Sequence, residues 1–342
     1  MAVALQKKGG CNILIISALA GVLALSSCRR DDLYYATVDR ATVRIEADWT
    51  PARLTPNGVS AFVFDRNGAA FDVVRSNDSR KADLSLPEGS YSVVVLNNTL
   101  DEYRNIESAG TDRLETFALM GRAVSPNFTS LGGGTRAESF IGEPDTVAGS
   151  VVRNIEVTRK MIEYFRTKPH GMEPAPAAVY QTAPTRIISV ADIRVHVKGL
   201  KYAAGAPRTH LKNLSGGYYL DSDKPHSLQV CHEFVLNNRC FDAEDPRNGT
   251  ITRQLATFGL HDETGVRYLM EMEFVLLNGE KHPVSLDVTD AIRVTQGATH
   301  KIIHIEVEIE LPEVIGNGDG AFAPDLEEWE PVITFTAPSS VT

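Results

Sequence analysis

Apolar and polar residues alternate along three long stretches of the sequence, and this period of two constrains the fold more than any other feature. Residues 41–49 place Val43, Ile45 and Trp49 on one side and polar residues on the other, and residues 192–200 and 302–311 repeat the pattern. Because successive side chains of a strand point to opposite faces, each stretch is expected to be a strand with one dry face. Half-exposed strands are typical of antiparallel sheets.

Shorter apolar stretches between turn signals predict further strands at 59–65, 91–97, 116–123 and 268–277. Many short strands with few helices favour β-sandwiches, so we expect an all-β protein. A single modest helix is predicted over 101–117, a stretch that Gly110 weakens.

The first 27 residues have the three parts of a secretory signal: a basic start, an apolar run over 12–25 and small residues before Cys28. The apolar run is too short for a comfortable membrane span, which needs roughly 20 residues. We therefore expect residues 1–27 to be removed.

The charge of the remaining chain argues against nucleic-acid binding. Removing the two lysines of residues 1–27 leaves 32 basic residues against 44 acidic ones, a net charge of −12. Phosphate recognition needs clustered Lys and Arg, so no nucleic-acid partner is expected. About 315 residues remain, enough for two domains.

The domain boundary is placed near residue 148. Residues 125–149 are rich in Gly, Ser and Thr and poor in apolar side chains, which is typical of a linker or a long surface loop. The predicted organisation is therefore a tether over 28–40, an N-terminal domain over 41–148 and a C-terminal domain over 149–342. A proline-rich stretch at 168–184 is expected to be extended.

No sequence motif announces catalysis, a cofactor or a metal: G-x-S-x-G, phosphate loops and H-E-x-x-H do not occur. His300 and His304 would share a face of a helix, but four residues of a strand span about 13 Å, so they are interpreted as surface histidines. The row Glu306, Glu308 and Glu310 is interpreted as a solvated strand face. We expect a protein that is not an enzyme.

Two further stretches carry weaker signals. Asn317, Asp319 and Asp325 lie in an oxygen-rich stretch that lacks the regular spacing of a calcium loop, so a flexible turn is favoured. Tyr218 and Tyr219 lie beside two glycines and could stack on a sugar, but adjacent strand residues point to opposite faces. A packed core tyrosine is the favoured interpretation.

The end of the signal resembles the lipobox of bacterial lipoproteins, since Leu25 lies three residues before Cys28 with small residues between them. The resemblance implies that the Cys28 thiol is acylated and holds the protein at the outer membrane, because two or three acyl chains anchor almost irreversibly. The Arg-Arg-Asp-Asp sequence at 29–32 resembles the surface-export tether of lipoproteins from gut and oral anaerobes. The alternative is a solvated charged tether that carries no export signal.

Two cysteines then remain, Cys231 and Cys240, in an oxidising compartment. A tight hairpin at 237–238 would pair Val235 with Cys240 and leave Cys231 without a partner, whereas a wider loop would allow a disulfide contributing about 2 to 3 kcal/mol. A disulfide and two free thiols both stay open.

Three stretches beyond the tether resemble the fimbrillin-like lipoproteins that build or anchor type V pili. The first is 157–165, likened to a family strand, and the second is 192–200 with 208–220 downstream. The third runs from 276 to 334 and contains Trp329. The resemblance implies two transthyretin-like antiparallel β-sandwiches and a role as a surface-exposed pilus subunit or anchor in adhesion, with other pilus subunits and surface ligands as partners.

The same resemblance implies assembly by strand donation, in which an extended segment of one subunit completes the sheet of the next. In stalk subunits of that family an arginine-specific protease removes the first strand, which makes Arg40 and Arg44 candidate processing sites, whereas a retained strand fits an anchor. The apolar residues 332, 333 and 335 form either a donor strand or a final strand. The alternative function is a glycan-binding surface lipoprotein associated with nutrient uptake.

Overall fold

The alternating stretches form strands in the computed structural model of the chain. β1 (Arg40–Ala47), β11 (Ser189–Lys198) and β21 (Lys301–Glu310) lie where the alternation predicts them. On β21 the side chains of Ile303 and Ile305 are buried, while Glu306 is exposed. The structure describes the following residues: 39–128, 138–167 and 175–314.

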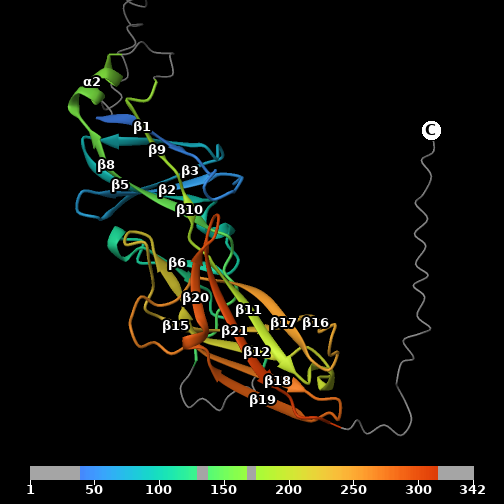
Figure 1. Cartoon of the computed structure of the whole chain (residues 1–342). Helices are drawn as coiled ribbons and strands as arrows, with labels where there is room; N and C mark the ends of the chain where they lie inside the picture. The colour runs from blue at the N-terminus through green and yellow to red at the C-terminus, as the bar shows by residue number, and fades with distance from the viewer. Residues whose placement is uncertain (1–38, 129–137, 168–174, 315–342) are drawn as a thin grey trace, which may run out of the picture.

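Two packed sheets form an N-terminal sandwich, in the upper part of Figure 1. The first has the order β4-β1-β9, with β4 (Lys81–Pro87) and β9 (Ala178–Thr182). The second has the order β10-β8-β5-β2-β3 and consists of Thr185–Arg186, Ala148–Val157, Gly89–Asn97, Val59–Asp65 and Ala70–Ser76. Their core includes Ile45, Leu84 and Val93.

The C-terminal sandwich also has two sheets. The first has the order β16-β17-β11-β21-β20, with β16, β17 and β20 at Asn238–Phe241, Gly249–Thr257 and Ile292–Gln296. The second has the order β15-β12-β18-β19, at Gln229–Val235, Arg208–Ser215, Leu269–Val275 and Lys281–Asp287. Side chains such as Ile193, Met272 and Ile305 fill the space between these sheets. The all-β sandwich fold predicted from the sequence is confirmed.

The predicted domain boundary at residue 148 is wrong. β8 begins at that residue and pairs with β5, and β9 pairs with β1, so the chain up to β10 completes the N-terminal sandwich. The passage to the C-terminal sandwich falls between β10 and β11 instead. The polar composition of residues 125–149 suggested a linker between domains. The described part of this stretch instead contacts the C-terminal sandwich and then returns to the N-terminal sandwich at β8.

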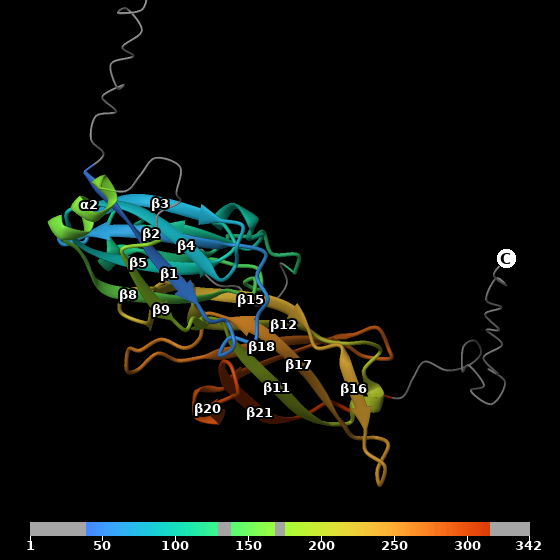
Figure 2. The same ribbon diagram turned by 90° about the horizontal axis from the view of Figure 1, so that it is seen from above.

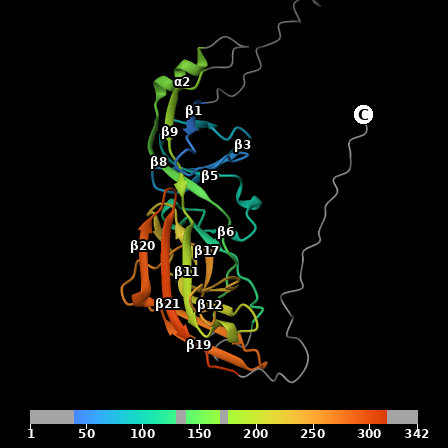
Figure 3. The ribbon, with the colours of Figure 1, turned by 45° about the vertical axis from the view of Figure 1, so that its right-hand side comes forward.

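Each sandwich contains a pair of parallel strands, in contrast to the antiparallel pairing that the alternation predicted. β9 runs parallel to β1, and β21 runs parallel to β11; the second pair lies side by side in Figure 3. The remaining strand ladders among the described residues are antiparallel. The alternation still holds because the outer faces of these sheets stay exposed, so burial pattern alone could not give the strand direction.

A small sheet joins the two sandwiches. Its order is β14-β13-β7-β6, at Lys224–Pro225, Gly217–Tyr219, Ala118–Gly121 and Ile106–Ala109, so it combines strands from both halves of the chain. A Cβ atom on Gly217 would lie 2.4 Å from the Met120 sulfur and 2.6 Å from the Leu119 carbonyl oxygen, so the close approach of β13 to β7 requires glycine.

A third core lies at this junction. Phe62 and Leu96 lie on the opposite faces of β2 and β5 from the N-terminal core and pack with Phe117, Tyr218 and other residues of the joining sheet. β2 and β5 are therefore buried on both faces, as their nearly continuous apolar sequences indicate. The two sandwiches therefore pack against each other through apolar side chains and are not independent domains joined by a flexible linker.

The helix predicted over 101–117 is wrong. That stretch contains two short 3-10 turns, η1 (Leu100–Glu102) and η2 (Leu114–Thr116), on either side of β6. Gly110 has a φ of +60°, outside the helical region. The described helix is instead α2 (Arg159–Arg166), within the stretch likened to a family strand; it begins at a Thr158 capping box and buries Ile162. Two more 3-10 turns, η3 and η4, lie at Leu200–Tyr202 and Thr289–Ala291.

Candidate assembly site

β1 occupies the middle of a three-stranded sheet. Its residues 40–46 pair antiparallel with β4, and its residues 43–47 pair parallel with β9. Figure 2 shows β1 beside β4 at the surface of the N-terminal sandwich. Ala41, Val43 and Ile45 are at most 1% exposed, so alternate side chains of β1 fill the core while its polar residues face outward.

Removing β1 would therefore leave a groove with a definite shape. Both neighbouring strands would present unpaired backbone groups, since each hydrogen-bonds to β1 along one edge. The floor of the groove would lose the side chains at 41, 43, 45 and 47. Such a groove accepts another extended segment through main-chain hydrogen bonds and pockets for alternate side chains.

A polar hollow of about 760 Å³ lies at the C-terminal end of β1. Its walls include Glu46 and Asp48 from the chain at this end, Lys81 of β4 and Gln181 of β9. Hydrogen bonds from Thr50 hold the pKa of the Asp48 carboxyl below its usual value. The hollow is lined by charges of both signs and marks the open end of the sheet.

Arg44, a predicted processing site, lies in the middle of β1. Its guanidinium forms two hydrogen bonds with the Asp83 carboxylate of β4, at 2.7 and 2.9 Å. This pairing raises the pKa of Arg44 and lowers that of Asp83. Its backbone is paired with strands on both sides, so a protease could not bind this segment in extended form without first displacing β1.

Arg40, the other predicted processing site, is exposed at the start of β1. It donates a hydrogen bond to the Ser85 carbonyl oxygen at 2.9 Å and lies over the ring of Phe71. Cleavage after Arg40 would leave the strand from Ala41 onward in its sheet. Neither predicted arginine is placed so that a cut would release β1 whole.

Arg53, which sequence reasoning did not single out, lies on the exposed loop between β1 and β2. Its φ is +49°, an uncommon conformation for a residue with a side chain. A cut after Arg53 would separate all of β1 from β2. The signal in the sequence was its position between two predicted strands, in a stretch with two prolines.

The disulfide left open between Cys231 and Cys240 is not formed. Cys231 is buried on β15, whereas Cys240 is exposed on β16, and these strands belong to different sheets of the C-terminal sandwich. The tight hairpin at 237–238 is also absent, because β16 pairs with β17 instead of β15. Burial raises the pKa of the Cys231 thiol, so this thiol stays protonated at neutral pH.

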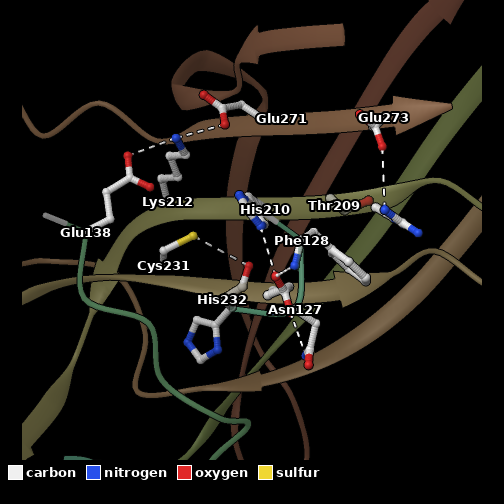
Figure 4. A network of polar contacts seen from close by, with 12 residues as sticks. Asn127, Phe128, Glu138, Thr209, His210, Lys212, Cys231, His232, Glu271 and Glu273 are labelled. Atoms are coloured by element: carbon white, nitrogen blue, oxygen red, sulfur yellow. Dashed lines mark hydrogen bonds and ion pairs between the residues drawn. The ribbon is translucent and has the colours of Figure 1, made fainter. Parts of the chain in front are cut away.

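Cys231 belongs to a region where the chain after β7 crosses onto the C-terminal sandwich (Figure 4). We call the described residues 122–128 and 138–147 the strap. The Cys231 amide donates to the Ser139 carbonyl oxygen at 2.8 Å, and the Ile141 amide donates to the Cys231 carbonyl oxygen at 3.1 Å. The strap therefore adds main-chain hydrogen bonds along the edge of β15.

Charged groups fix the strap at two further points. The Glu233 carboxylate accepts hydrogen bonds from the backbone amides of Asn127 and Phe128, at 2.7 and 2.8 Å. Lys212 forms ion pairs with Glu138 of the strap at 2.9 Å and with Glu271 of β18 at 2.8 Å. These partners compensate the burial of both charges, so the strap ties the sandwiches together.

His300 and His304 do not form a metal site. His304 lies on β21 with Nδ1 3.7 Å from Asp192, while His300 is half-buried before that strand and its Nδ1 lies 2.8 Å from the Thr299 hydroxyl oxygen. Within the described ranges, no group of three His, Cys, Asp or Glu residues is arranged to hold a metal ion.

The acidic row on β21 faces solvent, as the sequence predicted. Glu306 lies 2.8 Å from His196, and Glu308 pairs with Lys198, both across the parallel ladder to β11. These hydrogen bonds lower the pKa of both carboxyls, so Glu306 and Glu308 are ionised at neutral pH.

Several predicted features lie outside the described residues. They are the signal peptide, Cys28 with its tether, the acidic loop at Asn317, Asp319 and Asp325, Trp329, and the apolar segment Val332, Ile333 and Phe335. Over the described residues, no helix has the length and apolar composition of a membrane span.

Solved structures share the fold of this chain. A candidate adhesin from Bacteroides ovatus is 17% identical, with 81% of this chain and 94% of that chain covered at a TM-score of 0.52. The fimbrial anchor protein Mfa2 from Porphyromonas gingivalis is 12% identical, with 78% and 90% covered at a TM-score of 0.46. The tip fimbrial protein Mfa3 from the same organism is 11% identical, with 80% and 96% covered at a TM-score of 0.35.

At these identities, the likeness to the Bacteroides ovatus structure shows a shared fold. The comparison with curated proteins gave no match. A family model described as a domain of unknown function (DUF5119) matches residues 27–234, which span the N-terminal sandwich, the strap and the start of the C-terminal sandwich. Because this match covers more than half of the sequence, the chain belongs to that family.

Proposed function

We propose that this protein is a fimbrial subunit of the outer-membrane surface, lipid-anchored through Cys28, that assembles by exchanging β1 for a strand of another subunit. The observation that carries the proposal is the position of β1 between β4 and β9, with its alternate side chains buried. The fimbrial and adhesin neighbours support a role of this class.

The burial of β1 explains why exchange, not simple loss, is expected. Empty sockets beneath positions 43 and 45 would expose apolar surface to water, and two strand edges would lose their hydrogen-bond partners. A donor segment with alternate apolar residues restores both interactions. Residues 331–335, with the sequence Pro-Val-Ile-Thr-Phe, are our candidate donor.

Release of β1 requires a cut between β1 and β2. Arg53 meets this requirement, since it lies on the exposed loop after the strand. The same cut would detach the lipid on Cys28, so a cleaved subunit would be free to join a fibre. We therefore propose Arg53, in place of Arg40 and Arg44, as the processing site.

The test uses residues 28–342 carrying the substitution Cys28→Ala. This protein is treated with an arginine-specific protease and analysed on gels after mild and strong heating. We expect a new N-terminus at Leu54 and a ladder of heavier species that strong heating collapses. Arg53→Lys keeps the charge and should abolish both the cut and the ladder. A cut after Arg40 or Arg44 that yields the same ladder would contradict the assignment.

Arg66→Lys is the matched control, because Arg66 is also exposed on a turn, between β2 and β3. This variant should be processed like the parent chain. A correctly cut chain that stays monomeric would overturn strand exchange, whatever the protease site.

A further inference from the structure

A two-chambered cleft lies beside β10, the strand near the middle of Figure 1 that leads from the N-terminal to the C-terminal sandwich. Its larger chamber has a volume of about 510 Å³ and its smaller one about 190 Å³. The chambers adjoin, because Thr185, Ile187, Tyr218 and Asp223 line both of them. The larger volume is within the range of small-molecule sites, about 300 to 1,000 Å³.

Five segments far apart in the sequence build the larger chamber. They are the loop after β1 at Pro51, β10 with the residues leading into β11, the hairpin of β13 and β14, the loop after β17, and the turn between β20 and β21. Neither sandwich forms this cleft alone. Tyr218 and Phe258 are buried at 8% and 1% exposure in the junction core, so part of the wall is rigid.

The lining carries charges of both signs: the cations Arg186 and Lys301 and the carboxylates Asp223 and Asp262. Lys224, in an ion pair with Asp262, and Lys301 nearby both lower the pKa of the Asp262 carboxyl. Arg186 and Lys301 both line the larger chamber, and within the part of the chain that the structure describes neither forms an ion pair. Arg186 uses its Nε to donate to the Ala52 carbonyl oxygen at 2.8 Å, which orients the guanidinium and leaves its terminal nitrogens for a ligand. This arrangement favours a carboxylate, which a guanidinium binds through two hydrogen bonds.

Two imidazoles lie in the same chamber. Burial and the charge of Arg186 lower the pKa of His300, so this ring is neutral at pH 7 and can donate or accept a hydrogen bond. The Nε2 atom of His261 is buried and has no hydrogen-bond partner among the described residues. Because that atom has no exposed surface, His300 is the imidazole of this lining that can reach a ligand.

The rest of the lining offers acceptors, hydroxyl groups and apolar surface. Asp223 accepts a hydrogen bond from Tyr218 at 2.8 Å and keeps its other oxygen, while Gln296 and Thr299 add neutral polar groups. Ile187 and Leu260 supply apolar patches. Mixed donors and acceptors with apolar patches match a ligand whose rings carry many hydroxyl groups and expose C–H faces.

We propose that this cleft binds an acidic saccharide, with the sugar carboxylate held by Arg186 and Lys301 and the ring hydroxyls by His300 and Asp223. The adjoining smaller chamber is the proposed place of a second sugar ring. The site is separate from the β1 groove and does not depend on strand exchange, so the uncut chain carries it.

The test measures binding by calorimetry, using the uncut chain with Cys28→Ala. The probe is a trisaccharide that ends in glucuronic acid, compared with the same trisaccharide ending in glucose. We expect saturable binding of the acidic probe, and binding of the neutral one weaker by about ten-fold or more. Equal affinity for both probes, or no saturable binding of the acidic one, would overturn the proposal.

Variants locate the site. Arg186→Gln and Lys301→Gln should each weaken binding of the acidic probe by roughly ten-fold. Arg194→Gln, an exposed arginine on β11 away from the cleft, is the matched control and should leave binding unchanged. Lys301 is exposed, so its variant keeps the test valid if Arg186→Gln unfolds the junction.

Competition distinguishes a saccharide site from a general anion site. Inorganic phosphate at ten times the probe concentration should displace little of the acidic trisaccharide. Full displacement by phosphate would show a site for anions only, and binding that neither cleft variant changes would place the ligand elsewhere; both results contradict the proposal.

Discussion

The two sandwiches repeat one arrangement with different strength. In each, the first described strand lies between an antiparallel neighbour and a parallel one: β1 lies between β4 and β9, and β11 lies between β17 and β21. The parallel neighbour comes late in each unit. Because no internal repeat is visible in the sequence, this correspondence is a property of the pairing and not of the residues.

The surroundings of the two strands differ. β9 covers β1 only over residues 43–47, whereas β21 covers β11 over residues 190–198. Both neighbours of β1 are edge strands, whereas β17 and β21 are each followed by a further strand. The comparison teaches that β11 is built into its sandwich, whereas β1 is held by a minimal sheet and is the better candidate for exchange.

The largest expected effect comes from a carboxylate buried in either strand. Ile45 and Ile193 are 1% and 0% exposed at equivalent places in β1 and β11. Ile193→Asp should destabilise the C-terminal sandwich by more than about 4 kcal/mol, because an unpaired charge replaces core packing. Ile45→Asp should displace β1 alone. Hydrogen exchange checks both, and global loss of protection in Ile45→Asp would break the comparison.

Truncating the junction core should separate the two sandwiches. Phe117 is fully buried, with ring centroids 5.0 Å from Phe62 and 6.0 Å from Phe64. Phe117→Ala should cost about 3 to 5 kcal/mol and split thermal unfolding into two calorimetric transitions. Phe71→Ala, at a residue 40% exposed, is the control and should preserve the parent profile. Identical profiles for both variants would argue against a coupling core.

Acid should weaken the C-terminal sandwich first. His232 is buried, and burial lowers its pKa to about 4, so the unfolded chain binds the proton more readily. Stability from this group is complete above pH 6.5 and falls as the pH decreases toward 4, by on the order of 3 kcal/mol. Denaturant titrations at pH 7 and 4.5 measure the loss.

Two variants sharpen this prediction. His232→Leu removes the titrating group and should flatten the pH dependence between 6.5 and 4, whereas His304→Leu, on the surface, should not. The chain has no histidine before residue 170, so no histidine of strands β1 to β8 contributes to this pH dependence. An unchanged acid dependence in His232→Leu would place the sensitivity in carboxylates.

The smallest expected effect concerns the surface ion pair of β1. Arg44 and Asp83 are partly exposed, so the coupling energy in a double-mutant cycle with Arg44→Gln and Asp83→Asn should be about 0.2 to 1 kcal/mol. The pair between Lys198 and Glu308 on the C-terminal sandwich gives the matched cycle. Salt should weaken both couplings. A coupling of several kcal/mol at Arg44 would mean that β1 is held more firmly than its ladders indicate.

Much of the fold could be predicted because the burial of a strand residue follows from its place in the local alternation of apolar and polar residues. Val43 and Ile45, or Ile303 and Ile305, face the core because alternate residues of a strand share a face. The processing site that we propose could not be predicted in the same way. Arg40 and Arg44 are close to the first strand in sequence, but only strand pairing shows that a cut at either leaves part of β1 in the sheet.

The local pattern of residues predicts the all-β character of the chain, the core-facing side of each alternating strand and the solvated acidic row of β21. The parallel pairing of β1 with β9, the passage between sandwiches after β10, the junction core and the cleft beside β10 follow only from the folded arrangement. The physical reason is the range of the interactions: side-chain alternation acts between neighbouring residues. Strand partners, and the cavity that Arg186, Tyr218 and Lys301 share, depend on contacts between segments far apart in the chain.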